Sequence, residues 1–266
     1  MANNLKTYWI YIRVFFKARS EYRVGFVAGV FANFYCYLLT FLSFLVIVSK
    51  FESIAGWKFE EMSILYGLNL FTYAMAGMLV WYSIYHLERE ITTGRLDLYL
   101  TRPMNVIGQL ICSRFGDTFI GQIIVSLIFL LNALLKINNN ISIGTILYFI
   151  VVLISGVCMQ VGSMIIIGSL SFWTLRSERI GSLIYYKLRS LTHYPLIIFP
   201  QWIKGLLTVI PWAFINYYPT VVILGLKQSK MDYFWGICAP AVGVGVLILS
   251  IWLFNSGLDQ YTGSGN

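Results

Sequence analysis

The chain has 266 residues, of which 58% are hydrophobic and 11% are charged. Soluble domains carry roughly 25% charged residues, so this composition and a mean hydropathy of +0.74 exclude an ordinary soluble protein. The length allows about six spans of roughly 20 residues and leaves no room for a separate nucleotide-hydrolysing domain. The net charge of +8 is spread over short segments beside apolar runs, which argues against nucleic-acid binding. The expected fold class is an all-α polytopic membrane protein with six transmembrane helices.

Residues 5–20 predict an amphipathic helix that lies along the membrane surface. Its apolar face carries Leu5, Tyr8, Trp9, Ile12, Phe15 and Phe16. Its cationic face carries Lys6, Arg13 and Lys17. No small-residue cleavage site follows, so we do not expect a signal peptide. The helix either anchors the chain or takes part in coupling, and the sequence leaves both alternatives open.

Six apolar segments follow, and they predict spans at about 24–48, 62–85, 118–135, 143–173, 194–214 and 233–254. The fifth segment contains Pro195, Pro200 and Pro211, which indicate a kinked or discontinuous span. Residues 215–232 are expected to form a longer outer loop. In the last span, small residues suited to close helix packing are Ala239, Ala241, Gly243 and Gly245.

The candidates for a substrate path are three polar side chains inside these spans: Asn33, Asn69 and Lys204. An amide in a span needs a partner on another helix, so Asn33 and Asn69 should face the bundle. For both, a helix–helix contact is the favoured interpretation and a substrate contact is the alternative. Lys204 is expected to extend from a tilted, proline-broken segment to an interface, or else to contact substrate.

The distribution of basic residues predicts the topology. Six spans place both termini on one side, together with the polar segments 86–117 and 174–195. That side carries most of the arginines, whereas the other side carries Lys50, Lys58, Lys136, Lys227 and Lys230. The positive-inside rule then places both termini and both polar segments in the cytoplasm.

Residues 86–117, called here the central polar segment, hold charges of both signs between two spans. Gly94 can end a helix that continues from the second span, and Arg102-Pro103 imposes an extended or turning backbone. Asn105 can cap a new helix. On that helix one face is expected to carry Val106, Ile107, Leu110, Ile111 and Phe115, while Asn105, Gln109 and Ser113 point away. A short amphipathic helix held between two spans can transmit a displacement at the membrane surface to those spans.

The string TGRLDLYLTRP, residues 93–103, resembles the cytoplasmic-loop motif of permease subunits of type-2 ATP-binding-cassette exporters, the ABC-2 family. It is most similar to the branch in which two unlike six-span permeases work with one ATPase. Residues 194–202, 210–219 and 257–261 agree with the resemblance, although Asp259 stands where a basic residue is expected. The resemblance covers essentially the whole chain, so residues 1–266 are expected to form a single ABC-2 transmembrane domain.

The resemblance implies an exporter permease that moves an amphipathic substrate (lipid, peptide or drug) out across the bacterial cytoplasmic membrane. It implies a cytoplasmic nucleotide-binding ATPase, itself a homodimer, that binds ATP and Mg, while this chain binds no cofactor. It also implies a second six-span permease or a second copy of this chain, a coupling helix that docks on the ATPase, and re-entrant helices between spans five and six. Carried over by position, the expected ATPase contacts are Gly94, Arg95, Asp97, Arg102 and Pro103.

Other classes were weighed on the residues that they require. An intramembrane enzyme needs a paired catalytic set, but His86 and His193 lie at span ends and no acidic residue lies inside a span. The four cysteines have no metal-ligand spacing. We therefore expect no catalytic site and no metal site. An ion-coupled secondary transporter and a non-transporting assembly subunit remain as alternatives.

Overall fold

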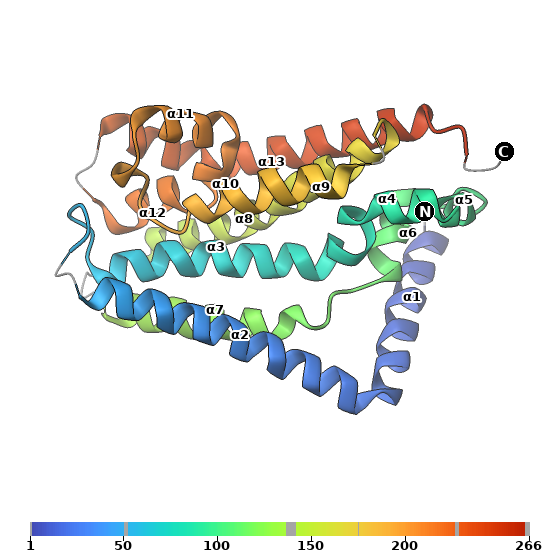
Figure 1. Cartoon of the computed structure of the whole chain (residues 1–266), viewed down its shortest axis with the longest axis horizontal. Helices are drawn as coiled ribbons and strands as arrows, with labels where there is room; N and C mark the ends of the chain where they lie inside the picture. The colour runs from blue at the N-terminus through green and yellow to red at the C-terminus, as the bar shows by residue number, and fades with distance from the viewer. Residues whose placement is uncertain (1, 51–52, 137–141, 175, 227–228, 264–266) are drawn as a thin grey trace.

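The computed structural model describes residues 2–50, 53–136, 142–174, 176–226 and 229–263, and within these ranges it consists of helices and turns without a β-sheet (Figure 1). Lys227, residues 137–141 between the third and fourth predicted spans, and the last three residues lie outside them. The long apolar segments form helices because they bury side chains against one another, as an all-α membrane protein must.

Five long helices run side by side along the longest axis of the molecule: α2 (Arg23–Ser49), α3 (Phe59–Val80), α7 (Phe119–Lys136), α8 (Ile143–Ser169) and α13 (Lys230–Asp259) (Figure 1). Each is long and apolar enough to cross a membrane. Helix α1 (Ala2–Glu21) lies across one end of the bundle, at a steep angle to α2. Both chain termini lie at that end, which we call the terminal end; the opposite end is the far end.

The central polar segment forms three short helices at the terminal end. Helix α3 continues through a π-helical turn, Trp81–Tyr85, into α4 (Leu87–Thr92). Gly94 then reverses the chain with φ = 68°, a conformation that side-chain-bearing residues rarely adopt. Helices α5 (Arg95–Leu100) and α6 (Val106–Ser113) follow before the chain enters α7.

Residues 177–191 form a continuous helix, which we call the fifth helix, although the sequence placed them in a solvated polar segment. It comprises α9 (Ser177–Gly181), a π-helical turn (Ser182–Tyr186) and α10 (Lys187–Leu191), and it runs beside α8 from the terminal end (Figure 1). Tyr185 is fully buried and Arg189 is 8% exposed. Part of the polar segment 174–195 is therefore packed into the bundle, which its basic residues did not indicate.

The predicted span 194–214 is not one helix. It contains two short 3-10 turns, Leu196–Ile198 and Pro211–Phe214, on either side of α11 (Gln201–Val209). The next helix, α12 (Tyr217–Leu224), falls in the predicted outer loop. Helix α11 is bent by 81° from the Pro211–Leu224 segment, and both α11 and α12 lie at the far end (Figure 1). The prolines break the backbone ladder. The bent pair of helices between the fifth helix and α13, which has the geometry of a broken span or of a re-entrant loop, is called here the re-entrant hairpin.

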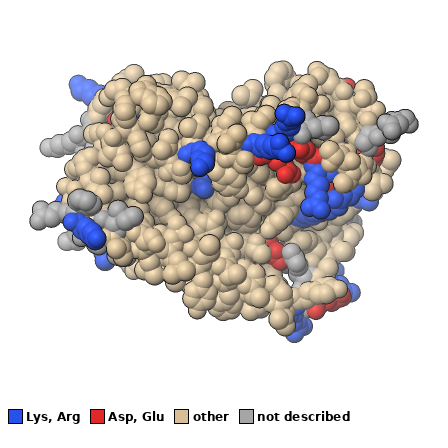
Figure 2. All heavy atoms as spheres, in the orientation of Figure 1, with Lys and Arg blue, Asp and Glu red and all other residues tan. Residues whose placement is uncertain are grey.

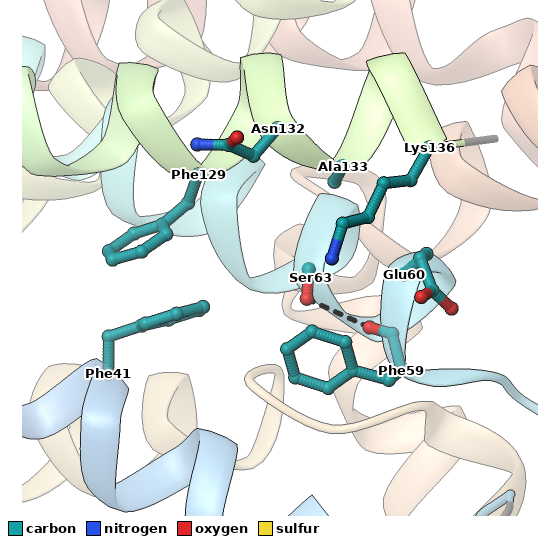
Figure 3. Close-up of a pocket in the computed structure, with 8 residues that line it drawn as sticks. All are labelled: Phe41, Phe59, Glu60, Ser63, Phe129, Asn132, Ala133 and Lys136. Carbon is teal, nitrogen blue, oxygen red and sulfur yellow. Dashed lines mark hydrogen bonds between the residues drawn. The ribbon is translucent and has the colours of Figure 1, made fainter. Parts of the chain in front are cut away.

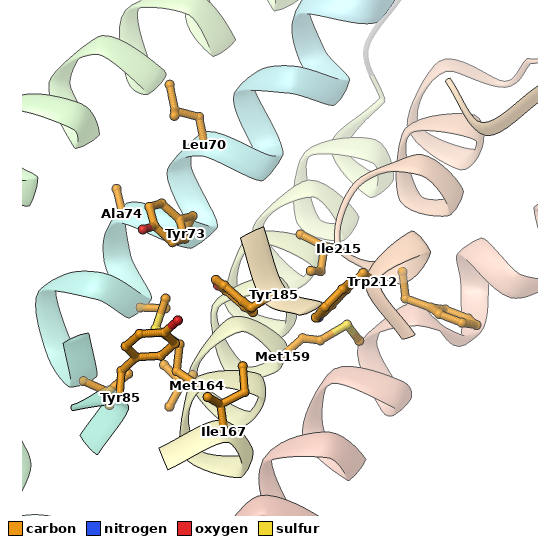
Figure 4. Close-up of a cluster of buried hydrophobic side chains, with 14 of the residues drawn as sticks. Leu70, Tyr73, Ala74, Tyr85, Met159, Met164, Ile167, Tyr185, Trp212 and Ile215 are labelled. Carbon is orange, nitrogen blue, oxygen red and sulfur yellow. The ribbon is translucent and has the colours of Figure 1, made fainter. Parts of the chain in front are cut away.

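A buried aromatic cluster joins these elements. Tyr185 of the fifth helix packs edge-on against Trp212, with ring centroids 5.6 Å apart (Figure 4). Tyr85 lies 6.1 Å from Tyr185, and the Trp212 indole N–H donates to Ser163 Oγ of α8 at 3.2 Å. Aromatic rings bury large apolar areas, so this cluster fixes the fifth helix against α3 and α8.

Helix α13 packs on α8 through small residues, but not through all those predicted. Gly236, Ala239 and Gly243 are buried, whereas Ala241 and Gly245 are exposed. The buried residues follow helical spacing, so they share one face, while 241 and 245 point to the opposite side.

Candidate functional site

Helix α6 is the last of the three helices in the central polar segment. The Asn105 side chain accepts a hydrogen bond from the Gly108 backbone N–H at 3.1 Å, so Asn105 is the cap that the sequence predicts. Val106, Ile107 and Leu110 are buried. Helix α1 covers the segment: the rings of Phe15 and Phe115 lie 5.5 Å apart, although Phe115 itself follows the end of α6.

Gln109 does not point away from the fold, as the sequence predicts, but is fully buried. Its Nε2 donates to the backbone oxygens of Tyr99 and Met104, each at 3.0 Å. The side chain thus satisfies carbonyl groups at the end of α5 and in the turn before α6. This pairing makes α5 and α6 a single unit.

Glu90 of α4 is the electrostatic centre of the segment. It is 2% exposed, and Arg114 Nη1 lies 3.0 Å from its Oε1. Arg95 Nε lies 3.6 Å from its Oε2. A buried carboxylate needs such partners to remain charged at acceptable cost. Glu90 therefore links Arg95, the first residue of α5, and Arg114, the residue after α6, to α4.

The five predicted ATPase contacts differ in their surroundings. Gly94 makes the turn, and Arg95 points to Glu90 and donates to Thr93 Oγ1 at 3.1 Å, so both shape the segment. Arg102 and Pro103 are exposed, although Arg102 also donates to the Tyr11 hydroxyl of α1. Asp97 is half-buried.

The sequence reasoning missed two exposed apolar residues on α5. Leu98 is 61% exposed and Leu100 is 44% exposed, next to the exposed Thr101. A short helix that presents exposed leucines has the character of a protein-binding surface. In the sequence, the sign of this surface is the leucines that alternate with polar residues in the string 93–103.

The central polar segment is joined directly to the fifth helix. Glu88 Oε2 of α4 accepts hydrogen bonds from Ser177 Oγ at 3.1 Å and from the Glu178 backbone N–H at 3.0 Å. His86 Nδ1 lies 2.8 Å from Glu178 Oε1. These contacts hold the first turn of the fifth helix against α4.

The two amides proposed for a substrate path have different surroundings. Asn69 is fully buried, donates from Nδ2 to Thr192 Oγ1 at 2.8 Å and accepts from Arg189 Nη1 at 2.6 Å. It therefore joins α3 to the fifth helix. Asn33 of α2 is half-buried, and no described residue bonds its buried side-chain oxygen.

Lys204 of α11 pairs with an acid that the sequence reasoning did not consider. Its Nζ lies 2.7 Å from Asp232 Oδ1, and the Tyr217 hydroxyl donates to Asp232 Oδ2 at 3.1 Å. The Asp232 side chain is 6% exposed. Lys204 thus holds the re-entrant hairpin to the first turn of α13.

Two hollows lie at the far end. A groove of about 490 Å³ is lined by residues of α11, α12 and the start of α13, including Lys204, Thr208, Tyr218, Asp232 and Trp235. A pocket of about 160 Å³ lies between Phe41, Phe59 and Phe129, with Glu60 and Lys136 also lining it (Figure 3). Ligand sites usually measure 300–1,000 Å³, so only the groove is large enough for a drug-sized molecule.

The described residues contain no group of three metal-ligating side chains, and the four cysteines are not paired. Burial raises the pKa of the Cys112 thiol on α6, which keeps it protonated and unreactive at neutral pH.

A protein-family model described as "ABC-2 family transporter protein" matches residues 34–265. No curated protein and no solved structure matches the chain. The match takes in the central polar segment, the fifth helix, the re-entrant hairpin and all five long helices except the first part of α2. Since it spans most of the sequence, the chain belongs to the ABC-2 family of transporter proteins.

Proposed function

We propose that this chain is the transmembrane permease subunit of an ATP-driven exporter that moves an amphipathic substrate (lipid, peptide or drug) out of the cell. Membership of the ABC-2 family makes the chain a multi-pass membrane permease that associates with an ATPase subunit. The observation that supports ATP-driven transport is the exposed α5 surface, formed by Leu98 and Leu100. It lies on a segment that is bonded to two helices of the bundle.

In this proposal the ATPase binds ATP and Mg, and its docking surface receives α5. Closure of the ATPase dimer pushes on the central polar segment. The push passes along α4 into α3, and through Glu88 into the fifth helix. A ligand shifts an equilibrium only by its differential affinity for two states, so α5 must contact the ATP-bound dimer differently from the free one.

The charge pattern supports a cytoplasmic terminal end. The central polar segment carries Arg89, Arg95, Arg102 and Arg114, and Arg176 and Arg179 lie at the start of the fifth helix. Charged side chains gather densely at the terminal end (Figure 2). By the positive-inside rule this end, with both termini, faces the cytoplasm of a bacterial cell.

A second six-span permease, or a second copy of this chain, completes the transport unit. An ion-coupled carrier is the other transport candidate, because Asp232 is a buried carboxylate. Carriers place such a group near mid-membrane, but Asp232 lies in the first turn of α13 and is neutralised by Lys204. We therefore favour ATP-driven transport.

The test is co-purification of the tagged chain with the ATPase and second permease encoded beside it. The variant Leu98→Ser/Leu100→Ser is expected to lose the ATPase and keep the second permease. The matched control, Ile197→Ser/Ile198→Ser, changes two residues of 46% and 40% exposure in the 3-10 turn that precedes α11, and should keep both partners.

Two outcomes contradict the proposal. If the parent chain purifies without an ATPase under conditions that preserve related complexes, the ATP-driven function is wrong. If the parent binds the ATPase and the Leu98/Leu100 variant binds it equally well, α5 is not the docking surface.

A further inference from the structure

The fifth helix exposes a cation on a face of mixed character. Gly181, Tyr185 and Arg189 recur every four residues and are buried against the bundle. The exposed residues on the other side are Ser182, Leu183, Ile184, Lys187 and Ser190, of which Leu183 and Ile184 are apolar. A helix face in contact with lipid alone would carry apolar residues and no cation.

The lipid-facing helices of this chain follow that rule. On α2 the large exposed hydrophobic residues are Val24, Val27, Phe31, Tyr35, Leu39, Leu42 and Val46. From Val24 to Ser49, α2 carries no charged residue at all. The fifth helix, by contrast, exposes the cation Lys187.

The contacts of Arg189 show how far along the bundle axis Lys187 lies. Its guanidinium lies 4.1 Å from the Tyr73 ring centroid and bonds Asn69, both on α3. At a rise of 1.5 Å per residue, Tyr73 is about 20 Å from Phe59 and from Tyr85. Lys187 precedes Arg189 by two residues, about 3 Å of helix. Both cations therefore lie near the middle of the membrane-spanning part.

Neither cation has an acidic partner among the described residues. Arg189 is held only by Asn69 and by the Tyr73 and Tyr185 rings, and its buried Nε has no hydrogen-bond partner there. The described acids lie at helix ends or in the central polar segment. A second copy of this chain, contributing the same fifth-helix face, would supply no carboxylate at this level.

A lysine at mid-membrane is costly against lipid, and its side chain is too short to reach an interface from there. Such residues face a water-filled path, a ligand or a partner. We infer that Lys187, with Arg189 behind it, lines the transport path and binds the anionic group of the transported substrate, a phosphate or carboxylate on an apolar chain. This inference rests on the proposed transport function and narrows its substrate class to anionic amphiphiles.

The test uses two photo-reactive probes, dodecyl phosphate and a dodecyl trimethylammonium analogue, each with a diazirine beside the headgroup. The permease–ATPase complex in phosphatidylcholine nanodiscs is irradiated, and labelled peptides are identified by mass spectrometry. The phosphate probe should label residues 182–191 about tenfold more than the cationic probe, as a charge-assisted hydrogen bond predicts. Labelling of α2 should not distinguish the probes.

Variants separate binding from folding. Lys187→Gln lies on the exposed face, so it should fold and yet lose most of the preference for the phosphate probe, whereas Lys187→Arg should retain it. Arg179→Gln, at the exposed start of the same helix, is the matched control and should leave labelling unchanged. Adding ATP and Mg should lower labelling if the bound group is moved.

Three results would each overturn the inference. The first is equal labelling of residues 182–191 by the two probes in the parent chain. The second is a Lys187→Gln variant that keeps phosphate labelling and releases the second permease, which makes Lys187 an interface residue. The third is labelling that ATP does not change, which indicates a static lipid. Loss of the ATPase from the parent complex would instead contradict the proposed function. Labelling of the permease alone then still reports whether the anion site exists.

Discussion

The backbone N–H of Glu178 donates to Glu88 Oε2 at 3.0 Å, so a side chain of α4 caps the first turn of the fifth helix. The first N–H groups of a helix have no partner within it. A carboxylate at that position also interacts favourably with the positive end of the helix dipole. Two segments that are 90 residues apart in sequence thus share a hydrogen bond between the predicted docking site and the helix that we propose lines the transport path.

The substitution Glu88→Ala should leave ATPase binding intact and uncouple the fifth helix from it. Removing a cap costs about 1 kcal/mol, too little to unfold the protein. Labelling of Ser190→Cys, in a background without the four native cysteines, reports movement of the fifth helix. The ATP-dependent change in labelling should fall sharply in Glu88→Ala and persist in the control Glu60→Ala at the far end. A full ATP response in Glu88→Ala would remove this contact from the coupling path.

Glu90→Ala should destabilise the protein as a whole. Breaking a buried ion pair costs about 3–5 kcal/mol, but the Arg95 and Arg114 side chains are 37% and 42% exposed, so we expect about 2 kcal/mol. Thermal unfolding of the purified chain in detergent measures the loss as a lower midpoint. The control is Asp259→Ala, an exposed acid at the end of α13. An unchanged midpoint in Glu90→Ala would show that the pairs are not structural.

The parts of this structure that local sequence determines were predictable. The α6 cap at Asn105 and the breaks at Pro195, Pro200 and Pro211 each depend on residues a few positions away. Capping and proline geometry act over one helical turn, so the sequence alone indicates them.

The fifth helix was not predictable in this way, because distant residues satisfy its polar side chains. Arg189 bonds Asn69, 120 positions away, and the Tyr185 hydroxyl donates to Gln160 of α8. A basic residue without such partners belongs in water, and the charge rule treats it so. Gln109 was misplaced for the same reason, and the Asp232 partner of Lys204 was missed, since such partners are not visible in a local pattern.

Gly243→Ala should destabilise the bundle, whereas Gly245→Ala should not. A Cβ at Gly243 would overlap the carbonyl oxygen of Ser155 on α8, and backbone cannot move aside cheaply. Overpacking of this kind costs about 1–3 kcal/mol. At Gly245 nothing lies within 4 Å of the added atom, so alanine gains helix propensity at no steric cost. Unfolding midpoints in detergent compare the two; equal effects would contradict the close α8–α13 contact.

Lys204 and Asp232 should be energetically coupled, and a double-mutant cycle measures the coupling. Lys204→Met or Asp232→Asn alone leaves a partly buried charge without its partner, so each should lower stability. The double variant removes both charges and should recover part of the loss, giving a coupling energy of about 1–3 kcal/mol.

The control cycle uses Glu60 and Lys136, which line the pocket in Figure 3 without forming an ion pair. Their coupling should be near zero. Because Lys204 is on α11 and Asp232 on α13, coupling would show that the re-entrant hairpin is locked to the last helix at the far end. Additive effects of Lys204→Met and Asp232→Asn would mean that the hairpin is held by packing alone, and that the carboxylate is free for another role, such as the ion coupling that the ATP-driven proposal sets aside.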